Sequence, residues 1–378
     1  MSLSRRRFLE LSSVTAGLTA ATTLFDVAAF ADTEPPQGGV SLTKGAILLN
    51  SNENAYGAFP SVRQAMADAI AVTNRYPDYE FDALWKGLAA LHKAKTEEIT
   101  LGCGSTDILR MAAEAFCGRG KPLVTASPTF EALAMYAARN GTETIKVPLR
   151  SDFAHDLEQM LVKAKQGAGL VYICNPNNPT GSLTARKQME QFVHDLPADT
   201  YVLIDEAYHH FVTAPGDYVS FADQRMQDPR IIVARTFSKI YGMAGLRLGY
   251  AVGAKETIEK LSASYVFDNP NCIAARAGAA ALADKKGLDA AIRRTVADRE
   301  EFNRQSAARS LKSIPSQANF VMVDAGRPTR VVIDHFKAHN VWVGRPFPPL
   351  DTHVRVSLGT PAEMRQFWQV WDMLPAVS

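Results

Sequence analysis

The sequence of 378 residues holds only four cysteines, and no two of them form a C-x-x-C pair. It also has no H-E-x-x-H motif and no cysteine–histidine cluster, so we expect no structural metal site. Cys103 and Cys174 lie in apolar or glycine-rich surroundings, where cysteine commonly serves as a small buried side chain. A disulfide is an open alternative, because export, which the N-terminal residues indicate, would permit one.

An excess of charge of either sign is also missing. The 41 lysines and arginines nearly balance the 39 aspartates and glutamates, which leaves a formal net charge of +2. The basic residues are spread along the chain, which argues against nucleic acid as a partner. With 47% hydrophobic residues, the chain can form one large domain and a smaller one, and we expect a soluble globular protein.

The N-terminal residues have the features of an export signal. Arg5-Arg6 and Phe8-Leu9 precede a moderately apolar stretch, which ends in the small-x-small pattern Ala29-Phe30-Ala31. The paired arginines resemble the twin-arginine signal, which directs folded proteins to their export machinery. We therefore predict a periplasmic protein whose signal is cleaved near Ala31.

The same stretch lacks the uninterrupted apolar run of a membrane span. Asp26 and many hydroxyl residues interrupt it, so we expect no stable membrane anchor. An amphipathic helix or an uncleaved anchor is the alternative interpretation.

Short apolar runs alternate with helical patterns through the middle of the chain. Runs rich in Val, Ile, Leu and Tyr are predicted strands, at Pro122–Ala126, Glu143–Val147, Leu170–Cys174, Tyr201–Asp205, Ile231–Arg235 and Leu248–Val252. One intervening helix is predicted at Thr129–Arg139, ended by Asn140-Gly141. Continuously apolar strands separated by helices predict an α/β fold with a mostly parallel sheet sandwiched by helices.

The pattern changes beyond residue 270. One long helical stretch, Asn271–Ser310, precedes a strand at Asn319–Asp324, a helix, strands at Val341–Val343 and Val354–Leu358, and a closing helix. This order predicts a smaller α+β domain. The predicted domains are therefore a signal peptide at 1–31, an N-terminal arm at 32–60, a large domain at 61–270 and a small C-terminal domain at 271–378.

Polar residues follow several predicted strands, where ligands gather in sheets of this kind. Ser105 and Thr106 come after glycines and open a helical run, so their backbone N–H groups can bind a phosphate. Alternatively, these residue types form an ordinary helix N-cap through their side chains. Asn178, in Asn-Pro-Asn-Asn-Pro-Thr-Gly, can direct its amide over a strand end or simply shape a turn. Asp205 ends a strand, with Tyr208 three residues on, and can pair with a ring nitrogen or form a structural salt bridge.

A lysine stands in the run Arg235-Thr-Phe-Ser-Lys239, with Arg247 eight residues further on. A lysine beside hydroxyl groups, close to an arginine, suits an imine-forming amine next to an anion clamp. Most lysines are solvated surface residues, so the pattern carries more weight than Lys239 alone.

In order and spacing, these motifs resemble the fold-type I, pyridoxal 5'-phosphate-dependent aminotransferases of class I/II, in particular the histidinol-phosphate aminotransferase branch. The resemblance covers nearly all of the chain after the signal, from Leu49-Asn-Ser-Asn-Glu-Asn-Ala-Tyr-Gly57 and Asn74-Arg-Tyr-Pro77 to Val354-Arg-Val-Ser-Leu-Gly-Thr360. It implies a transaminase with pyridoxal 5'-phosphate as cofactor, an amino donor and a 2-oxo acid as substrates, and a homodimer.

The resemblance also implies a role for each matching residue. Lys239 would bind the cofactor as an imine and then act as base and acid, and Asp205 would keep the ring nitrogen protonated. Tyr208 and Asn178 would hydrogen-bond the phenolic oxygen of the cofactor. The phosphate would be held by Ser105, Thr106, Thr236, Ser238 and Arg247, and by Tyr76 from the other subunit. Arg355 would bind the α-carboxylate of the substrate.

Two departures from the family pattern argue against histidinol phosphate as the substrate. The position that stacks on the cofactor ring, usually tyrosine, is Phe130, and no tyrosine lies between Asp32 and Asn54 to fold over the substrate. Histidine synthesis is also a cytoplasmic pathway. Arg345 matches the region that binds the distal phosphate, so it favours an anionic substrate such as glutamate, aspartate or a phosphorylated amine, or else forms a salt bridge.

Other functions remain as alternatives. Decarboxylases, lyases and racemases use the same scaffold, and the sequence does not show which bond of the substrate aligns with the ring. A non-catalytic module that binds pyridoxal phosphate is disfavoured by Lys239, Asp205 and Arg355 together. A dehydrogenase is disfavoured because no G-x-G-x-x-G motif follows a strand.

Overall fold

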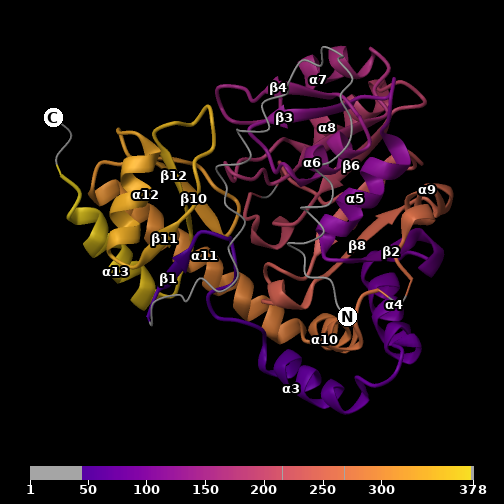
Figure 1. Cartoon of the computed structure of the whole chain (residues 1–378), viewed down its shortest axis with the longest axis horizontal. Coiled ribbons are helices and arrows are strands. Elements are labelled where there is room, and N and C mark those ends of the chain that lie inside the picture. Colours follow the sequence, from indigo (N-terminus) through magenta and orange to yellow (C-terminus); the bar gives the residue numbers. More distant parts are fainter. Residues whose placement is uncertain (1–44, 215, 268, 376–378) are drawn as a thin grey trace, which may run out of the picture. The chain divides into compact units, whose positions relative to one another are not determined.

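The computed structural model describes residues 45–375, except 215 and 268 (Figure 1). The predicted twin-arginine signal, its cleavage site and the arm up to residue 44 lie outside the described residues. Within the described part, no helix combines the length and the apolarity that crossing a membrane requires. All four cysteines are unpaired. Cys174 is buried as expected, whereas Cys103 is only partly buried, contrary to the expectation.

The main sheet has seven strands in the order β2-β8-β7-β6-β5-β3-β4. Their bounds are β2 Ile99–Cys103, β3 Leu123–Ser127, β4 Thr144–Pro148, β5 Leu170–Cys174, β6 Tyr201–Asp205, β7 Ile231–Thr236 and β8 Leu248–Gly253. The strands from β7 to β4 pair in parallel, which confirms the predicted mostly parallel sheet. Strand β8 runs antiparallel to both β7 and β2, and β2 was not predicted.

Helices cover both faces of this sheet, because its strands are apolar on both sides. In β5, Val171 and Ile173 join one hydrophobic cluster, whereas Leu170, Tyr172 and Cys174 join another, as the two-residue period of a strand requires. The first cluster includes α3 Pro60–Ala69, α4 Asp78–His92, α7 Leu157–Ala164, α8 Arg186–Asp195 and α10 Cys272–Ala283. The second includes α5 Ser105–Phe116, α6 Ala132–Arg139 and α9 Lys255–Leu261.

A separate hydrophobic cluster forms around a smaller sheet. Strands β9 Lys312–Ile314, β10 Phe320–Asp324 and β12 His353–Ser357 make an antiparallel sheet in the order β12-β10-β9, and β1 Ile47–Leu49 pairs in parallel with β11 Val341–Val343. Helices α11 Lys285–Ala308, α12 Thr329–Ala338 and α13 Pro361–Asp372 complete it. Its core is rich in aromatic rings in contact with one another: Phe336 stacks on Phe367, and Trp371 lies tilted against Phe367.

In the described part of the chain, five short 3-10 helices lie in the connections, at η1 Ile70–Val72, η2 Thr96–Glu98, η3 His209–Phe211, η4 Ala244–Leu246 and η5 Ser262–Ser264. Two predicted helices have other bounds than expected. The predicted helix Thr129–Arg139 begins only at Ala132. The stretch predicted as one helix over Asn271–Ser310 is two helices, because Asp284 ends α10 and its carboxylate caps α11 by accepting a hydrogen bond from Gly287 N.

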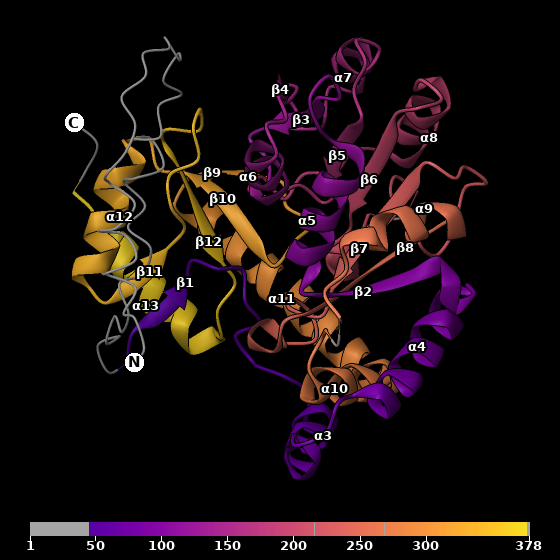
Figure 2. The ribbon, with the colours of Figure 1, turned by 45° about the vertical axis from the view of Figure 1, so that its right-hand side comes forward.

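The predicted division into domains stays a prediction, and three sets of contacts cross it. Helix α10 lies beyond residue 270 but packs against α3 and α4, beside the main sheet. Strand β1 precedes the predicted large domain but pairs with β11 of the small sheet. Helix α11 contacts η3 next to the main sheet as well as β9 and β10, and Figure 2 shows it running between the two groups of strands.

The start of α5 lies directly against β8 at Gly249. A Cβ atom at this position would come within 2.2 Å of Ser105 N and 2.5 Å of Gly104 C, both of which are backbone atoms. Strand β8 is also held by β2 and β7 on its two sides, so it has no room to move away.

We predict that Gly249→Ala destabilises the fold by about 1–3 kcal/mol, because the added methyl group overpacks a rigid contact. Urea unfolding of the cofactor-free protein would measure the effect. Gly245→Ala is the matched control, since nothing lies within 4 Å of a Cβ atom there. Equal stability of the two variants would contradict the prediction.

Candidate active site

The parallel strands β5, β6 and β7 end at one edge of the main sheet, and most of the predicted site residues lie there. Asn178 follows β5, Asp205 ends β6 and Lys239 follows β7. Cys174 and Asp205, the last residues of β5 and β6, are partners in register, so the two strand ends are level. The carboxyl ends of parallel strands are the usual ligand-binding edge of such a sheet.

Asp205 is a buried carboxylate with two hydrogen-bond donors from the protein. The Tyr172 hydroxyl donates to its Oδ2 at 2.9 Å, and Ala207 N donates to its Oδ1 at 3.1 Å. Burial raises the pKa of Asp205 to about 6, and the hydrogen bond from Tyr172 acts against this rise. A cation placed beside Asp205 would therefore stabilise its charged form.

Lys239 lies among charged groups of both signs. Its Nζ donates a hydrogen bond to Ser51 O at 3.3 Å and lies 5.7 Å from the centre of the Tyr208 ring. Burial and the positive charge of Arg355 lower the pKa of Lys239 to about 8, against an ordinary value of 10.5, whereas Glu53 and Asp205 act in the opposite direction. A lysine with such a pKa is partly uncharged near neutral pH and can act as a nucleophile.

A chain of hydrogen bonds connects Tyr208 to the small sheet. The Tyr208 hydroxyl accepts from Asn52 Nδ2 at 3.0 Å and from Asn178 Nδ2 at 3.4 Å. Asn178 Oδ1 in turn accepts from Arg355 Nη1 at 2.6 Å, and Asn50 O accepts from Arg355 Nη2 at 2.7 Å. The chain fixes the position of Arg355 on β12 relative to the edge of the main sheet.

Arg355 is a buried cation that lacks an anionic partner in the described part of the chain. Its side chain is buried, its Nε has no hydrogen-bond partner, and among the described residues no carboxylate forms an ion pair with it. Burial lowers the pKa of Arg355 to about 10. A carboxylate ligand would satisfy both the hydrogen-bonding groups and the charge.

The start of α5 and Arg247 form a candidate anion-binding site. Arg247 Nη2 donates to Thr106 Oγ1 at 3.1 Å, and its Nη1 donates to Ser238 Oγ at 3.4 Å. Gly104 has a φ of 77°, and a Cβ atom there would lie 2.2 Å from Arg247 Nη2, so only glycine allows this approach. The first N–H groups of α5 have no side-chain cap, as expected where an anion binds.

These residues fit pyridoxal 5'-phosphate. The anion-binding site formed by Arg247, Thr106 and the first N–H groups of α5 suits its phosphate. No carboxylate pairs with Arg247 in the described part of the chain, so its charge is available to the phosphate. Asp205 suits its ring nitrogen, and Lys239 suits its aldehyde. Thr236 Oγ1 accepts from Ser238 N at 3.1 Å, which holds these two predicted phosphate ligands together.

The other three predicted residues lie in connections between the helices and strands. Phe130 is partly buried in the connection between β3 and α6. Tyr76 is 74% exposed, in the connection between η1 and α4. Arg345 follows β11 and forms an ion pair with Glu131. Its role in substrate binding stays a prediction.

Two neighbours of the site, Asn52 and Tyr172, are not among the residues predicted from the sequence. Asn52 has a φ of 53°, a left-handed conformation that asparagine tolerates, and donates to Tyr208 while its own N donates to Ser357 Oγ at 2.8 Å. Tyr172 reaches Asp205 from the neighbouring strand. The alternation of side chains along β5 decides on which face Tyr172 lies. That its hydroxyl meets Asp205 depends on the pairing of β5 with β6.

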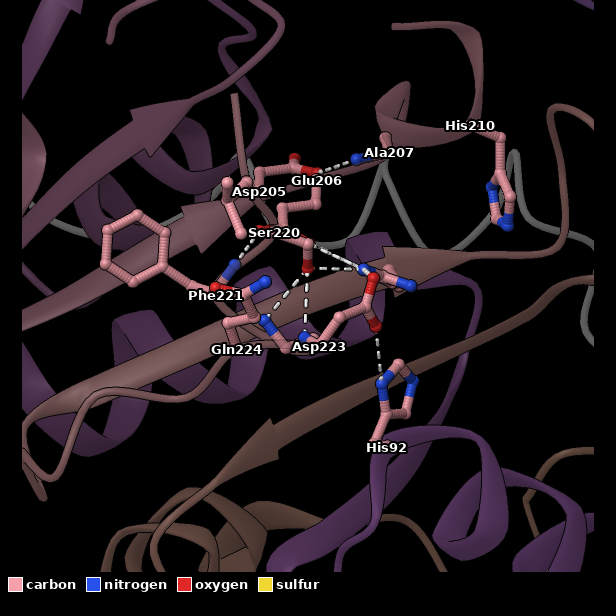
Figure 3. Close-up of polar contacts among 12 residues, drawn as sticks. His92, Asp205, Glu206, Ala207, His210, Ser220, Phe221, Asp223 and Gln224 are labelled. Atoms are coloured by element: carbon pink, nitrogen blue, oxygen red, sulfur yellow. Dashed lines mark hydrogen bonds and ion pairs between the residues drawn. The ribbon is translucent and has the colours of Figure 1, made fainter. Parts of the chain in front are cut away.

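A buried network supports the strand ends behind the site (Figure 3). Glu206, next to Asp205, accepts hydrogen bonds from Ser220 Oγ at 2.7 Å and Phe221 N at 2.7 Å. Arg235, next to Thr236, donates to Glu206 at 3.0 Å and to Asp223 at 3.1 Å. The ion pair therefore joins β6 to β7 one residue away from two predicted cofactor ligands.

The fold and this site define an enzyme of the pyridoxal-phosphate type, and comparison with known proteins identifies its family. Residues 44–370 match the family Aminotransferase class I and II. The chain is 37% identical to an aromatic amino acid aminotransferase from Rhodococcus jostii over 326 residues, which cover 85% of this chain and 88% of the relative. It is 36% identical to a histidinol-phosphate aminotransferase from Moorella thermoacetica, covering 86% of this chain and 84% of the relative.

A solved structure agrees with this similarity. The crystal structure of histidinol-phosphate aminotransferase from Sinorhizobium meliloti in complex with pyridoxal-5'-phosphate superposes with a TM-score of 0.81 at 30% identity, covering 87% of this chain and 90% of that one. The chain therefore belongs to the class I and II aminotransferases. It is a transaminase that depends on pyridoxal phosphate, which the relatives favour over the decarboxylase, lyase and non-catalytic alternatives.

Proposed function

We propose that this aminotransferase exchanges an amino group between an anionic amino acid or amine and a 2-oxo acid, outside the cytoplasm and as a homodimer. Glutamate, aspartate and phosphorylated amines are the candidate anionic substrates. One observation carries the substrate class: the guanidinium groups of Arg355 and Arg345 lie 4.7 and 4.3 Å from the centre of the same ring, Phe347. Two cations so placed suit a substrate with two acidic groups.

Pyridoxal 5'-phosphate supplies, when bound, an aldehyde for amines and a ring that withdraws electrons from the α-carbon. Asp205 would hold the ring nitrogen, and the Tyr208 and Asn178 side chains would bind the phenolic oxygen. Ser105, Thr106, Thr236, Ser238 and Arg247 would hold the phosphate. Lys239 Nζ would take the proton from the substrate α-carbon and return it at the end of the transfer.

Arg355 would orient the substrate by binding its α-carboxylate. Its Nη1 and Nη2 are held by Asn178 Oδ1 and Asn50 O, so the guanidinium plane is fixed before a substrate arrives. Binding of the carboxylate would also remove the unpaired buried charge. Lysine could not reproduce this planar, two-point contact.

An aromatic amino acid is the second candidate for one of the two substrates. Phe347 is buried beside Arg355, and Phe320 lies 5.1 Å from Tyr208 between ring centres, so apolar surface adjoins the anion-binding groups. The relative from Rhodococcus jostii carries the name aromatic amino acid aminotransferase. A transaminase binds its donor and its acceptor in turn, so the two can differ in side-chain charge.

We predict that the rate at which the cofactor-free protein binds pyridoxal phosphate rises about tenfold per pH unit and levels off above pH 8. The reason is that only the uncharged amine of Lys239 bonds to an aldehyde, and its pKa is lowered to about 8. Stopped-flow absorbance would measure the rate. A rate that still rises steeply beyond pH 10 would contradict the lowered pKa.

Lys239→Ala should give a protein without transaminase activity, whereas Lys260→Ala, on the exposed side of α9, should keep the wild-type rate. A turnover in Lys239→Ala equal to that of wild type would reject Lys239 as the catalytic base.

The homodimer is proposed from Tyr76, whose exposed side chain would bind the cofactor phosphate of the other subunit. We predict that Tyr76→Ala and Lys239→Ala each lack activity alone. Coexpressed, the two variants should recover about a quarter of the wild-type activity, because half of the dimers are mixed and each mixed dimer has one intact site. Mixed dimers isolated with two affinity tags should have about half of the wild-type activity, because one of their two sites is intact. No recovery, or a fully active Tyr76→Ala protein, would exclude this role.

The export proposal is supported by Arg5-Arg6 and the Ala29-Phe30-Ala31 pattern of the sequence. We predict that Arg5→Lys/Arg6→Lys keeps the full-length protein in the cytoplasm, since the export machinery reads the paired arginines. Fractionation followed by immunoblotting would locate the protein, with Arg293→Lys/Arg294→Lys as a matched control in α11. Periplasmic recovery of both variants in equal amounts would refute the proposal.

A further inference from the structure

The two arginines on Phe347 differ in their partners. Arg355 is 7% exposed, and none of the described carboxylates pairs with it. The Arg345 side chain is 45% exposed, and its Nη2 forms a short ion pair with Glu131 Oε2. Arg355 is therefore ready for a ligand carboxylate, whereas Arg345 already holds a carboxylate of the protein.

Glu131 is placed where a substrate side chain would meet it. It directly follows Phe130, the predicted ring-stacking residue, at the start of α6. Its partner Arg345 contacts the Phe347 ring, on which Arg355 also lies. The ion pair thus connects the loop after β3 to the loop after β11, beside the proposed binding site for the α-carboxylate.

The Arg345–Glu131 pair can open at small cost. Both side chains are about half exposed, at 45% and 50%, and ion pairs exposed to this extent contribute little free energy because water screens them. Within the described residues, the Arg345 side chain donates one other hydrogen bond, to the carbonyl of its neighbour Pro346. The guanidinium group can therefore exchange Glu131 for another carboxylate without disturbing the buried part of the site.

Transamination requires one site to bind two substrates, and their side chains can differ in charge. The same site must bind the donor and then the acceptor, and the proposed pair combines an acidic substrate with an uncharged aromatic one. An acidic side chain needs the charge of Arg345, whereas an uncharged one is better served by an Arg345 whose charge is already neutralised. A fixed arginine meets only the first requirement.

We propose that Glu131 is a specificity-determining residue that acts as an exchangeable counter-ion of Arg345. With an acidic substrate, the distal carboxylate replaces Glu131 on Arg345. With an uncharged substrate, the Arg345–Glu131 pair stays closed and the Phe347 ring remains available. This inference rests on the proposed function, because it assumes the anionic substrate class.

The test is the binding of two unreactive ligands to the holoenzyme, measured by calorimetry. Succinate represents the acidic substrates and 3-phenylpropanoate the aromatic ones. Glu131→Gln should tighten the binding of succinate about two- to fivefold, because succinate no longer competes with a protein carboxylate. It should not tighten 3-phenylpropanoate, whose uncharged ring gains nothing from an Arg345 that has lost its counter-ion. Asp372→Asn is the matched control, since it removes a half-exposed carboxylate from the pair with Arg309, and it should change neither ligand.

The Arg345→Gln background separates a direct exchange from a general charge effect. Arg345→Gln should weaken succinate binding, and adding Glu131→Gln to it should have no further effect. The inference is overturned if Glu131→Gln leaves succinate binding unchanged, shifts both ligands equally, or tightens succinate in the Arg345→Gln background as well. Unfolding midpoints of all variants would establish that each is folded.

The outcomes also distinguish this inference from the function on which it rests. A wild-type enzyme that transaminates glutamate or aspartate but fails the Glu131 test rejects the counter-ion alone. A wild-type enzyme that neither binds succinate nor transaminates any anionic donor rejects the anionic substrate class and the counter-ion together.

Discussion

The parallel pairing of β5, β6 and β7 is the constraint on which the site depends. It brings the loop of Asn178, the carboxylate of Asp205 and the loop of Lys239 to one edge, although 61 positions separate Asn178 from Lys239 in the chain. A shift of one residue in this register would turn every side chain of a strand to the opposite face. The buried pair of Glu206 and Arg235 joins β6 to β7 just behind the site, so it opposes such a shift.

The charges of the site are arranged for anionic ligands. Burial and the nearby positive charges of Arg355 and Arg247 lower the pKa of Lys239, and neither arginine has a carboxylate partner in the described part of the protein. Buried cations of this kind are costly until an anion neutralises them. The phosphate of the cofactor and the α-carboxylate of the substrate are the anions that the family chemistry supplies.

Contacts between the small sheet and the main sheet complete the candidate active site. Asn52 binds Tyr208 on one side and Ser357 on the other, and Asn319 Nδ2 donates to Asn52 O at 3.1 Å. Arg355 reaches Asn178 from β12. The substrate side of the site is therefore built from the arm, the small sheet and the main sheet together, and the exchangeable pair proposed for Glu131 and Arg345 lies across the same boundary.

The sequence by itself determined the strands of the main sheet from their apolar composition, and the family from the order of its polar motifs. It did not reveal β2, because the last residues of this strand, Leu101-Gly-Cys103, run directly into the glycine-containing start of α5, which the sequence indicated as a phosphate-binding segment. Only the tertiary structure decided that β8 runs antiparallel, that Tyr172 donates to Asp205, and that Arg345 binds Glu131 rather than standing free. Local sequence encodes which face a side chain occupies, whereas its partner is set by pairing between segments that are distant in the chain.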